Sequence, residues 1–162
     1  MAFPSRNCWF RSSLCRPSRR LCRLGIREII STSEAETLEW AVTFSRQLAA
    51  GDTVGLSGIL GAGKTVICRG IAAGLGFSGN VHSPSYALVH EYACGIPLFH
   101  MDLFRLSQNS DWEEIGLDHY FGLHGICLIE WPERLPEGNR LSNRIEIQRE
   151  GEARRRIRVI KS

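Results

Sequence analysis

The stretch Gly51–Thr65 reads Gly-Asp-Thr-Val-Gly-Leu-Ser-Gly-Ile-Leu-Gly-Ala-Gly-Lys-Thr, and it decides the fold of this chain. Its last eight residues, Gly58–Thr65, match the pattern G-x-x-x-x-G-K-[ST] and follow a short apolar run. A phosphate-binding loop needs several backbone N–H groups that converge on one anion, and glycine reaches the required conformations without a Cβ penalty. The following helix directs the positive end of its dipole to the same anion. The stretch therefore predicts a nucleotide-binding site.

Lys64 and Thr65 have separate expected roles in this loop. Lys64 supplies a full positive charge for the β- and γ-phosphates, and the hydroxyl of Thr65 is expected to hold Mg²⁺. The chain has 18 Arg but only two Lys, and Lys64 is one of these two. A glycine-rich turn before a core helix is the structural alternative. The lysine and the preceding apolar run favour the phosphate-binding loop.

Composition and charge limit the other classes of function. The length of 162 residues suits one domain, and no run of about 18 apolar residues exists that could span a membrane. Residues 1–27 carry seven Arg and no acid, whereas residues 28–162 have 13 basic and 17 acidic residues, a net charge of −4. Nucleic-acid-binding domains usually present a basic face. We therefore expect this domain to dock on partner proteins rather than to capture tRNA or DNA directly.

Residues 1–27 form an Arg-rich extension, which we interpret as a disordered tail or a misassigned start, with a targeting segment as the alternative. Residues 28–162 are expected to form the folded domain. The six cysteines include no C-x-x-C pair, which favours a reducing, cytoplasmic compartment. The nearby His90, Cys94 and His100 do not have the spacing of a zinc site.

The pattern of predicted elements indicates an α/β fold. We expect helices at 33–49, 64–75 and 111–115, strands at 53–56, 86–92, 98–103 and 125–130, and an edge hairpin around 150–152. A strand, a loop, a helix and then several strands predict a P-loop NTPase-like three-layer fold with a mixed β-sheet, built as a single domain.

Two predicted strands end in acidic residues, Asp102 and Glu130. In open α/β sheets, ligands gather beyond the carboxyl ends of the strands, and Mg²⁺ needs oxygen ligands opposite the phosphate loop. We therefore expect Asp102 and Glu130 to bind the metal with Thr65, and to act with Lys64 as the catalytic groups. The structural alternative for each acid is a solvated strand end.

The segment Ser83-Pro84-Ser85 and Trp131 are further candidates near the phosphates. Ser83 and Ser85 flank a proline in a loop that could close over the γ-phosphate as switch loops do, although an ordinary turn has the same composition. Trp131 follows Glu130 and is either a stacking surface or a core residue, of which we favour the core.

Several segments resemble the TsaE family, a group of small bacterial ATPases. They are Gly58–Thr65, Arg69-Gly70, Gly79–Val89, Phe99–Leu106, Gly116–Phe121 and Cys127–Pro132. The phosphate loop occurs in many families, but the Ser-Pro-Ser-Tyr, Asp-Leu-Phe-Arg-Leu and Glu-Trp-Pro segments in this order are far more specific. The resemblance covers roughly residues 30–160.

The resemblance implies an ATP- and Mg²⁺-dependent protein that works with TsaB and TsaD. That complex forms threonylcarbamoyladenosine at position 37 of tRNAs that read codons beginning with adenine, so tRNA is reached indirectly. By position, Gly61, Ala62, Gly63, Lys64, Thr65 and Val66 would wrap the phosphates, with Gly58, Ser83 and Ser85 as further ATP-binding residues. Thr65, Asp102 and Glu130 would approach Mg²⁺.

Two departures from the family pattern bear on hydrolysis. The family usually has Asp where Ile59 stands and a second Thr where Val66 stands. Ile59 removes a charge from the loop. A nucleotide-dependent scaffold that scarcely hydrolyses ATP is therefore one alternative function. A P-loop small-molecule kinase is the other alternative, but no Arg-rich lid sequence follows the core.

Overall fold

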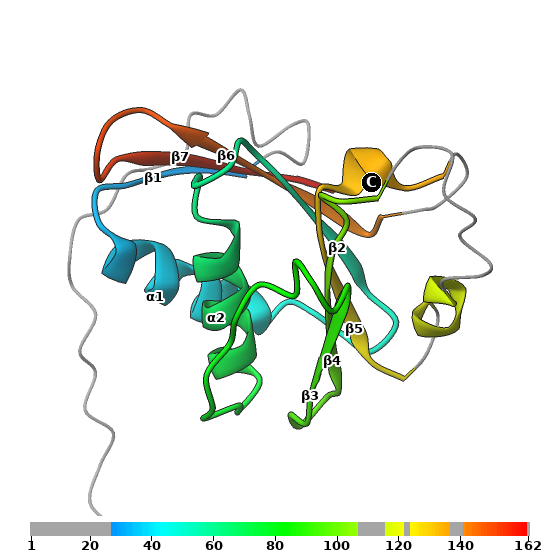
Figure 1. Cartoon of the computed structure of the whole chain (residues 1–162). Helices are drawn as coiled ribbons and strands as arrows, with labels where there is room; N and C mark the ends of the chain where they lie inside the picture. Colours follow the sequence, from blue (N-terminus) through cyan, green and yellow to red (C-terminus); the bar gives the residue numbers. More distant parts are fainter. Residues whose placement is uncertain (1–26, 107–115, 122–123, 137–140, 162) are drawn as a thin grey trace, which may run out of the picture.

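The computed structural model describes residues 27–106, 116–121, 124–136 and 141–161 (Figure 1). A mixed sheet runs through this part of the chain in the order β1-β7-β6-β2-β5-β4-β3. The strands are β1 (Arg27–Ser31), β2 (Thr53–Ser57), β3 (Val89–Tyr92), β4 (Leu98–Asp102), β5 (Ile126–Glu130), β6 (Asn143–Arg149) and β7 (Arg155–Lys161). The helices are α1 (Glu34–Ser45), α2 (Lys64–Gly74) and the short 3-10 helices η2 (Leu117–Tyr120) and η3 (Pro132–Arg134). The helix predicted at 111–115 lies outside the described residues.

The centre of the sheet is parallel and its two sides are antiparallel. Strand β2 pairs in parallel with both β5 and β6, and β5 pairs in parallel with β4. The outer pairs β3–β4, β6–β7 and β1–β7 are antiparallel. In this register Asp102 lies directly beside Glu130, and Glu130 lies beside Leu56 of β2. Both acids therefore lie at the carboxyl ends of the parallel strands, where the phosphate loop follows β2.

Helix α1 begins at the predicted capping residues. Ser33 is the N-cap, and its hydroxyl accepts a hydrogen bond from the N–H of Glu36. The Glu36 carboxylate in turn accepts the N–H of Thr32, so the first turn is closed from both sides. The helix ends at Ser45, earlier than predicted. The N–H groups of Gln47 and Leu48 bond to carbonyls three residues back, and the carboxylate of Asp52 accepts the N–H of Ala49.

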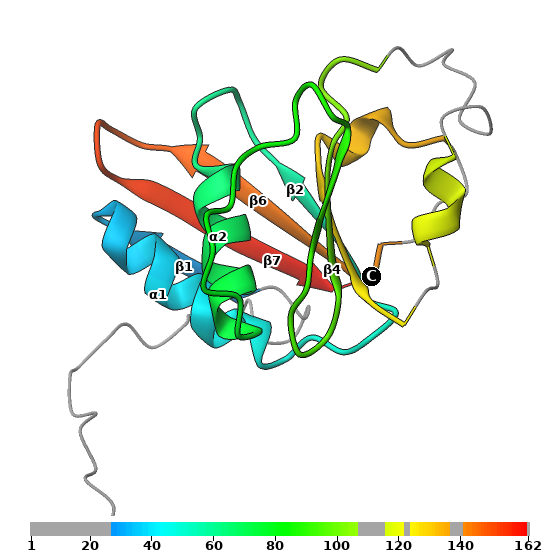
Figure 2. The same cartoon turned by 60° about the horizontal axis from the view of Figure 1, so that its bottom comes forward.

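Apolar clusters lie on both faces of the sheet and account for the layered fold. Helices α1 and α2 lie side by side on one face (Figures 1 and 2), where Leu56, Ile67 and Leu128 are fully buried. On the other face Met101 and Ile129 are buried against residues that include Tyr120 of η2. The predicted P-loop NTPase-like α/β fold with a mixed sheet in a single domain is thus confirmed. No helix among the described residues has the length and apolar character needed to cross a bilayer.

The hairpin predicted at the sheet edge is internal. Strand β1, which the sequence pattern did not indicate, pairs with β7 and places the β6–β7 hairpin between β1 and β2. Five residues next to an Arg-rich segment give too short an apolar pattern to predict a strand, and contacts with distant residues stabilise it, namely pairing with β7 and packing of Ile29 on the core. Strand β3 also starts later than predicted, at Val89, because Leu88 adopts a left-handed conformation with φ 63°.

Candidate nucleotide-binding site

The loop between β2 and α2 presents free backbone donors to solvent. Gly61 and Gly63 have φ values of 74° and 111°, in the region that favours glycine, and a Cβ at either position would meet nothing within 4 Å. Among the described residues, none accepts a hydrogen bond from the N–H groups of Gly61, Gly63, Lys64 or Thr65. Four unpaired N–H groups at the positive end of α2 form a site suited to an anion.

Lys64 is held against this loop. Its Nζ donates to the carbonyl oxygens of Gly58 at 2.8 Å and Ile59 at 3.2 Å, and lies 4.0 Å from the ring centroid of Trp131. Burial lowers the pKa of Lys64, while the carboxylates of Glu130 and Asp102 act in the opposite direction. The ammonium group is thus placed beside the free N–H groups, and an aromatic face lies beneath it.

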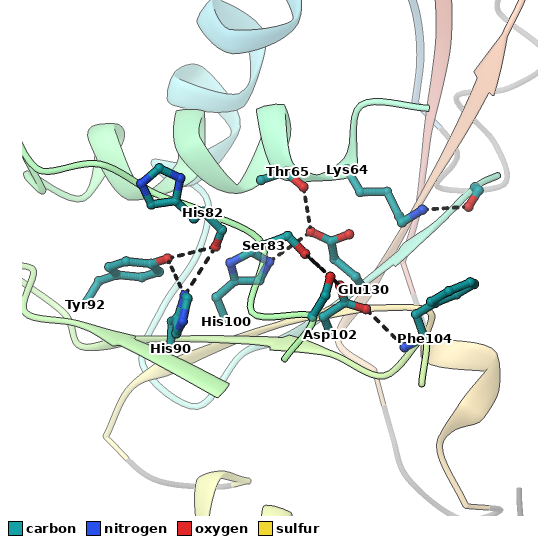
Figure 3. Close-up of polar contacts among 12 residues, drawn as sticks. Lys64, Thr65, His82, Ser83, His90, Tyr92, His100, Asp102, Phe104 and Glu130 are labelled. Atoms are coloured by element: carbon teal, nitrogen blue, oxygen red, sulfur yellow. Dashed lines mark hydrogen bonds and ion pairs between the residues drawn. The ribbon is translucent and has the colours of Figure 1, made fainter. Parts of the chain in front are cut away.

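Asp102 binds the loop that contains Ser83 and Ser85. The hydroxyls of Ser83 and Ser85 donate to its Oδ2 at 2.6 and 2.5 Å, and the N–H of Phe104 donates to Oδ1 at 3.0 Å. Figure 3 shows Ser83 and Phe104 beside the Asp102 carboxylate. Burial raises the pKa of Asp102, but these hydrogen bonds outweigh it, and the net pKa is lowered. Asp102 therefore remains a carboxylate and holds the serine loop over the site.

Glu130 faces the first turn of α2. Its Oε1 accepts a hydrogen bond from the hydroxyl of Thr65 at 3.1 Å and lies 3.0 Å from Nε2 of His100 (Figure 3). Glu130, Asp102 and Thr65 offer carboxylate and hydroxyl oxygens, which are the ligands that Mg²⁺ prefers. This donor set fits a magnesium ion beside the phosphate loop.

Two cavities flank the start of α2. The first, of about 300 Å³, is lined by Leu60, Gly61, Ala62, Gly63, Lys64, Thr65, Val66, Ser83, Ser85, Asp102, Phe104, Glu130 and Trp131. The second, of about 240 Å³, shares Ala62, Gly63 and Val66 and is otherwise lined by Glu34, Thr37, Glu152, Ala153 and Arg155. Nε of Arg155 donates to the carbonyl oxygen of Ala62 at 2.8 Å, which ties the β6–β7 turn to the loop.

The structure brings the predicted site residues together around the first cavity, with one exception. Gly58 contributes only its carbonyl oxygen, which accepts the hydrogen bond from Lys64. Ser83 and Ser85 line this cavity, and their hydroxyls bind Asp102 rather than project freely. Trp131 was expected in the core and is instead half-buried beneath Lys64.

Three contacts of the site were missed by reasoning from sequence. His100 could have been found, because it precedes Asp102 by two residues on a strand and therefore points to the same face. The N–H of Phe104 and the guanidinium of Arg155 gave no signal, because their contacts depend on a turn and on a distant hairpin. Trp131 adopts a left-handed φ of 62°, which turns the chain sharply after Glu130.

The sheet order, the phosphate loop after β2 and the acids on β4 and β5 define a P-loop NTPase-like nucleotide-binding protein. The family model described as "Threonylcarbamoyl adenosine biosynthesis protein TsaE" matches residues 31–157. The chain belongs to the TsaE family.

Individual relatives agree with this assignment. The chain is 45% identical over 112 residues to the tRNA threonylcarbamoyladenosine biosynthesis protein TsaE of Bacillus subtilis, covering 66% of this chain and 68% of that protein. It is 47% identical over 93 residues to the Haemophilus influenzae protein of the same name, covering 54% and 59%. The crystal structure of Bacillus subtilis YdiB superposes with a TM-score of 0.68 at 33% identity, covering 84% of this chain and 85% of that one.

Proposed function

We propose that this chain is the ATP-binding and ATP-hydrolysing subunit that acts with TsaB and TsaD in the formation of threonylcarbamoyladenosine at position 37 of tRNAs reading codons that begin with adenine. One observation carries the proposal: the free N–H groups of the loop, Lys64, Asp102 and Glu130 line one cavity. The family membership supports the role in tRNA modification. Because that pathway acts on tRNA, we place the chain in the cytoplasm.

The residues that line the first cavity have separate roles in phosphate binding and in hydrolysis. The loop N–H groups and Lys64 bind the phosphate oxygens, as charge-assisted donors do. Thr65, Glu130 and Asp102 would hold Mg²⁺, which when bound would supply positive charge to the phosphate oxygens. Ser83 and Ser85, fixed on Asp102, cover the γ-phosphate side of the cavity.

The second cavity receives the nucleoside part of ATP in this proposal. It lies on the other side of the start of α2 and shares Ala62, Gly63 and Val66 with the phosphate cavity, so one extended ligand can occupy both. Its volume of about 240 Å³ and its mixed polar and apolar lining suit a base with its ribose. The guanidinium of Arg155 contributes a planar cationic wall.

A nucleotide-dependent scaffold is the second candidate, and exposed apolar side chains favour it. Four large apolar side chains are exposed among the described residues: Ile59, Leu60, Tyr86 and Phe104. Leu60 and Phe104 line the phosphate cavity itself. Exposed apolar groups of this kind mark protein interaction sites. In this alternative, ATP controls docking on the partners and is hydrolysed rarely.

Steady-state ATP turnover tests the proposal and separates it from the scaffold. We expect slow turnover by the isolated chain and a strong increase when TsaB and TsaD are added, with and without tRNA. An arginine supplied in trans can raise such rates on the order of 10³- to 10⁵-fold in proteins that use one. ATP-dependent complex formation with no increase in turnover identifies a scaffold. Fast turnover that ignores the partners overturns the partner-dependent mechanism.

A further inference from the structure

His100 is an imidazole buried at a position where an apolar residue would pack more simply. Its side chain is fully buried in the middle of β4. Nδ1 of His100 has no hydrogen-bond partner among the described residues, and Nε2 lies 3.0 Å from Oε1 of Glu130. Burying an unpaired polar nitrogen is unfavourable. The contact with Glu130 is therefore the feature that explains a histidine at this position.

The geometry also assigns the direction of this hydrogen bond. A carboxylate oxygen only accepts, so Nε2 of His100 carries the proton and donates to Oε1 of Glu130. Thr65 donates to the same oxygen. No described residue donates to the second oxygen, Oε2, which lies on the side away from His100 in Figure 3. Two donors from two elements thus fix the rotation of one carboxylate and leave its other oxygen for the cavity.

We propose that His100 is a positioning residue that orients the Glu130 carboxylate toward the magnesium and phosphate site. The inference rests on the function proposed above, and it adds a residue that does not touch the nucleotide. His100 acts through Glu130, as histidines and carboxylates around metal ligands commonly do. Without the Nε2 donor, the Thr65 hydroxyl alone holds Glu130, and Thr65 is itself a proposed metal ligand.

Cys68 is the third buried residue beside His100 and Glu130. The donor atoms of Cys68, His100 and Glu130 all lie within 4.8 Å of one another, and all three residues are buried. Burial and the nearby carboxylates of Glu130 and Asp102 raise the pKa of the Cys68 thiol well above its usual range. Among the described residues, His100 and Thr65 make the side-chain hydrogen bonds to Glu130 and Cys68 makes none, so Cys68 offers a packing control at the same place.

Three variants separate positioning from packing. His100→Leu removes the donor and keeps a buried side chain of related size. His100→Gln restores an N–H donor, because the amide nitrogen of glutamine lies about as far from the backbone as Nε2 of histidine. Cys68→Ala opens a small cavity beside the pair without touching the hydrogen bond.

The measurement is ATP affinity by titration calorimetry, once with Mg²⁺ and once with EDTA, together with the melting temperature of each variant. The ratio of the two affinities is the magnesium gain. We expect His100→Leu to lower the magnesium gain by about tenfold or more while its affinity in EDTA stays at the parent value. His100→Gln should recover most of the gain. Cys68→Ala should lower the melting temperature and leave the gain unchanged.

The other outcomes contradict either the role of His100 or the proposed ATP-binding function on which it rests. A parent chain that binds no ATP overturns the proposed function. A parent that binds ATP equally well with and without Mg²⁺ overturns the metal role of Glu130, and the role of His100 with it. If the parent shows a magnesium gain that His100→Leu retains, or that Cys68→Ala loses equally, His100 only fills space and the inference is wrong.

Discussion

At the scale of single residues, Lys64 shows how the site is prepared for an anion. Its Nζ is bound to two loop carbonyls and lies over Trp131, so the ammonium group is already positioned before a phosphate arrives. The left-handed backbone of Trp131 costs on the order of 1 kcal/mol, and such strain persists where the surroundings require it. The strained residue provides the aromatic surface that keeps Lys64 in place.

Replacement of Lys64 by alanine should weaken ATP binding. The change removes a charge-assisted contact to the phosphates, worth about 1.5–3 kcal/mol, which corresponds to roughly a 10- to 150-fold loss of affinity. Calorimetric titration with ATP measures the loss, and circular dichroism checks that the fold survives. Lys161→Ala, at the exposed end of β7 and outside both cavities, is the matched control and should bind ATP like the parent. Equal affinity of Lys64→Ala and the parent would exclude a phosphate-binding role for this loop.

At the scale of elements, glycines set the distance between α1 and α2. A Cβ at Gly70 would lie 2.5 Å from Cβ of Ala41 and 2.7 Å from the carbonyl oxygen of Leu38. Both atoms belong to α1, one of them to its backbone, so neither can move without moving the helix. Because α2 carries the phosphate loop at its N-terminus, this close packing also fixes the position of the loop over the sheet.

Gly70→Val should therefore destabilise the domain. Overpacking costs about 1–3 kcal/mol, which for a domain of this size lowers the melting temperature by about 3–10 °C. Thermal unfolding followed by circular dichroism measures the change. Gly151→Val is the matched control, because the nearest atom to a Cβ there is 3.8 Å away. A Gly70→Val variant as stable as the control would mean that the helices can separate at little cost.

The pairing of β1 with β7 depends on ion pairs between side chains as well as on the backbone hydrogen bonds between the two strands. The carboxylate of Glu28 accepts hydrogen bonds from Arg156 and Arg158 of β7. The hydrogen bond from Arg158 is the largest cause that lowers the pKa of Glu28, and it outweighs the effect of burial. The strand that the sequence did not reveal is thus joined to the sheet by ion pairs across its outer face.

Glu28→Gln should make the domain less stable at neutral pH but not in acid. A carboxyl whose pKa is lowered in the folded state stabilises the fold above its unfolded pKa and loses this effect as the pH falls through its folded pKa. We expect a melting temperature a few degrees below the parent at pH 7, in the range of partly exposed ion pairs. The gap should begin to narrow as the pH falls below about 4.5, the ordinary pKa of a glutamate carboxyl, and close once the pH passes below the lower folded pKa of Glu28. A gap that is constant from pH 7 to pH 3 would show that the side chain contributes by packing alone.

At the scale of the whole molecule, charge divides the chain into two parts. Residues 1–27 carry seven Arg and no acid, whereas the rest of the chain has a net charge of −4. The basic excess of the chain therefore belongs to its first 27 residues, and the remaining sequence is mildly acidic. An acidic domain is better suited to docking on a protein than to binding the phosphates of tRNA directly.

Deletion of residues 1–24 should leave the domain intact. An Arg-rich segment with few apolar residues offsets little of the entropy lost on ordering. The melting temperature should change by less than about 2 °C, within the range of surface changes, and ATP affinity should stay at the parent value. Differential scanning calorimetry and ATP titration measure both. A large loss of stability in the shortened chain would show that the segment packs on the domain.

The sequence determined the phosphate loop, the helix after it, the acids at two strand ends and the mixed α/β fold. These features are local, because glycine spacing, a lysine and an apolar run specify a loop without reference to distant residues. The Ser33 cap and the strands ending in Asp102 and Glu130 are local in the same sense. This is why the fold, and most of the candidate residues that line the first cavity, could be predicted from the sequence.

Only the tertiary structure decided how those residues act on one another. The pairing of β4 with β5 sets Asp102 beside Glu130, and the packing of α2 on that sheet brings Thr65 to the same carboxylate. The role of His100 depends on this arrangement, as does the internal place of the β6–β7 hairpin beside β1. Contacts between residues 28 or more positions apart depend on strand order and helix packing, which no short sequence pattern specifies.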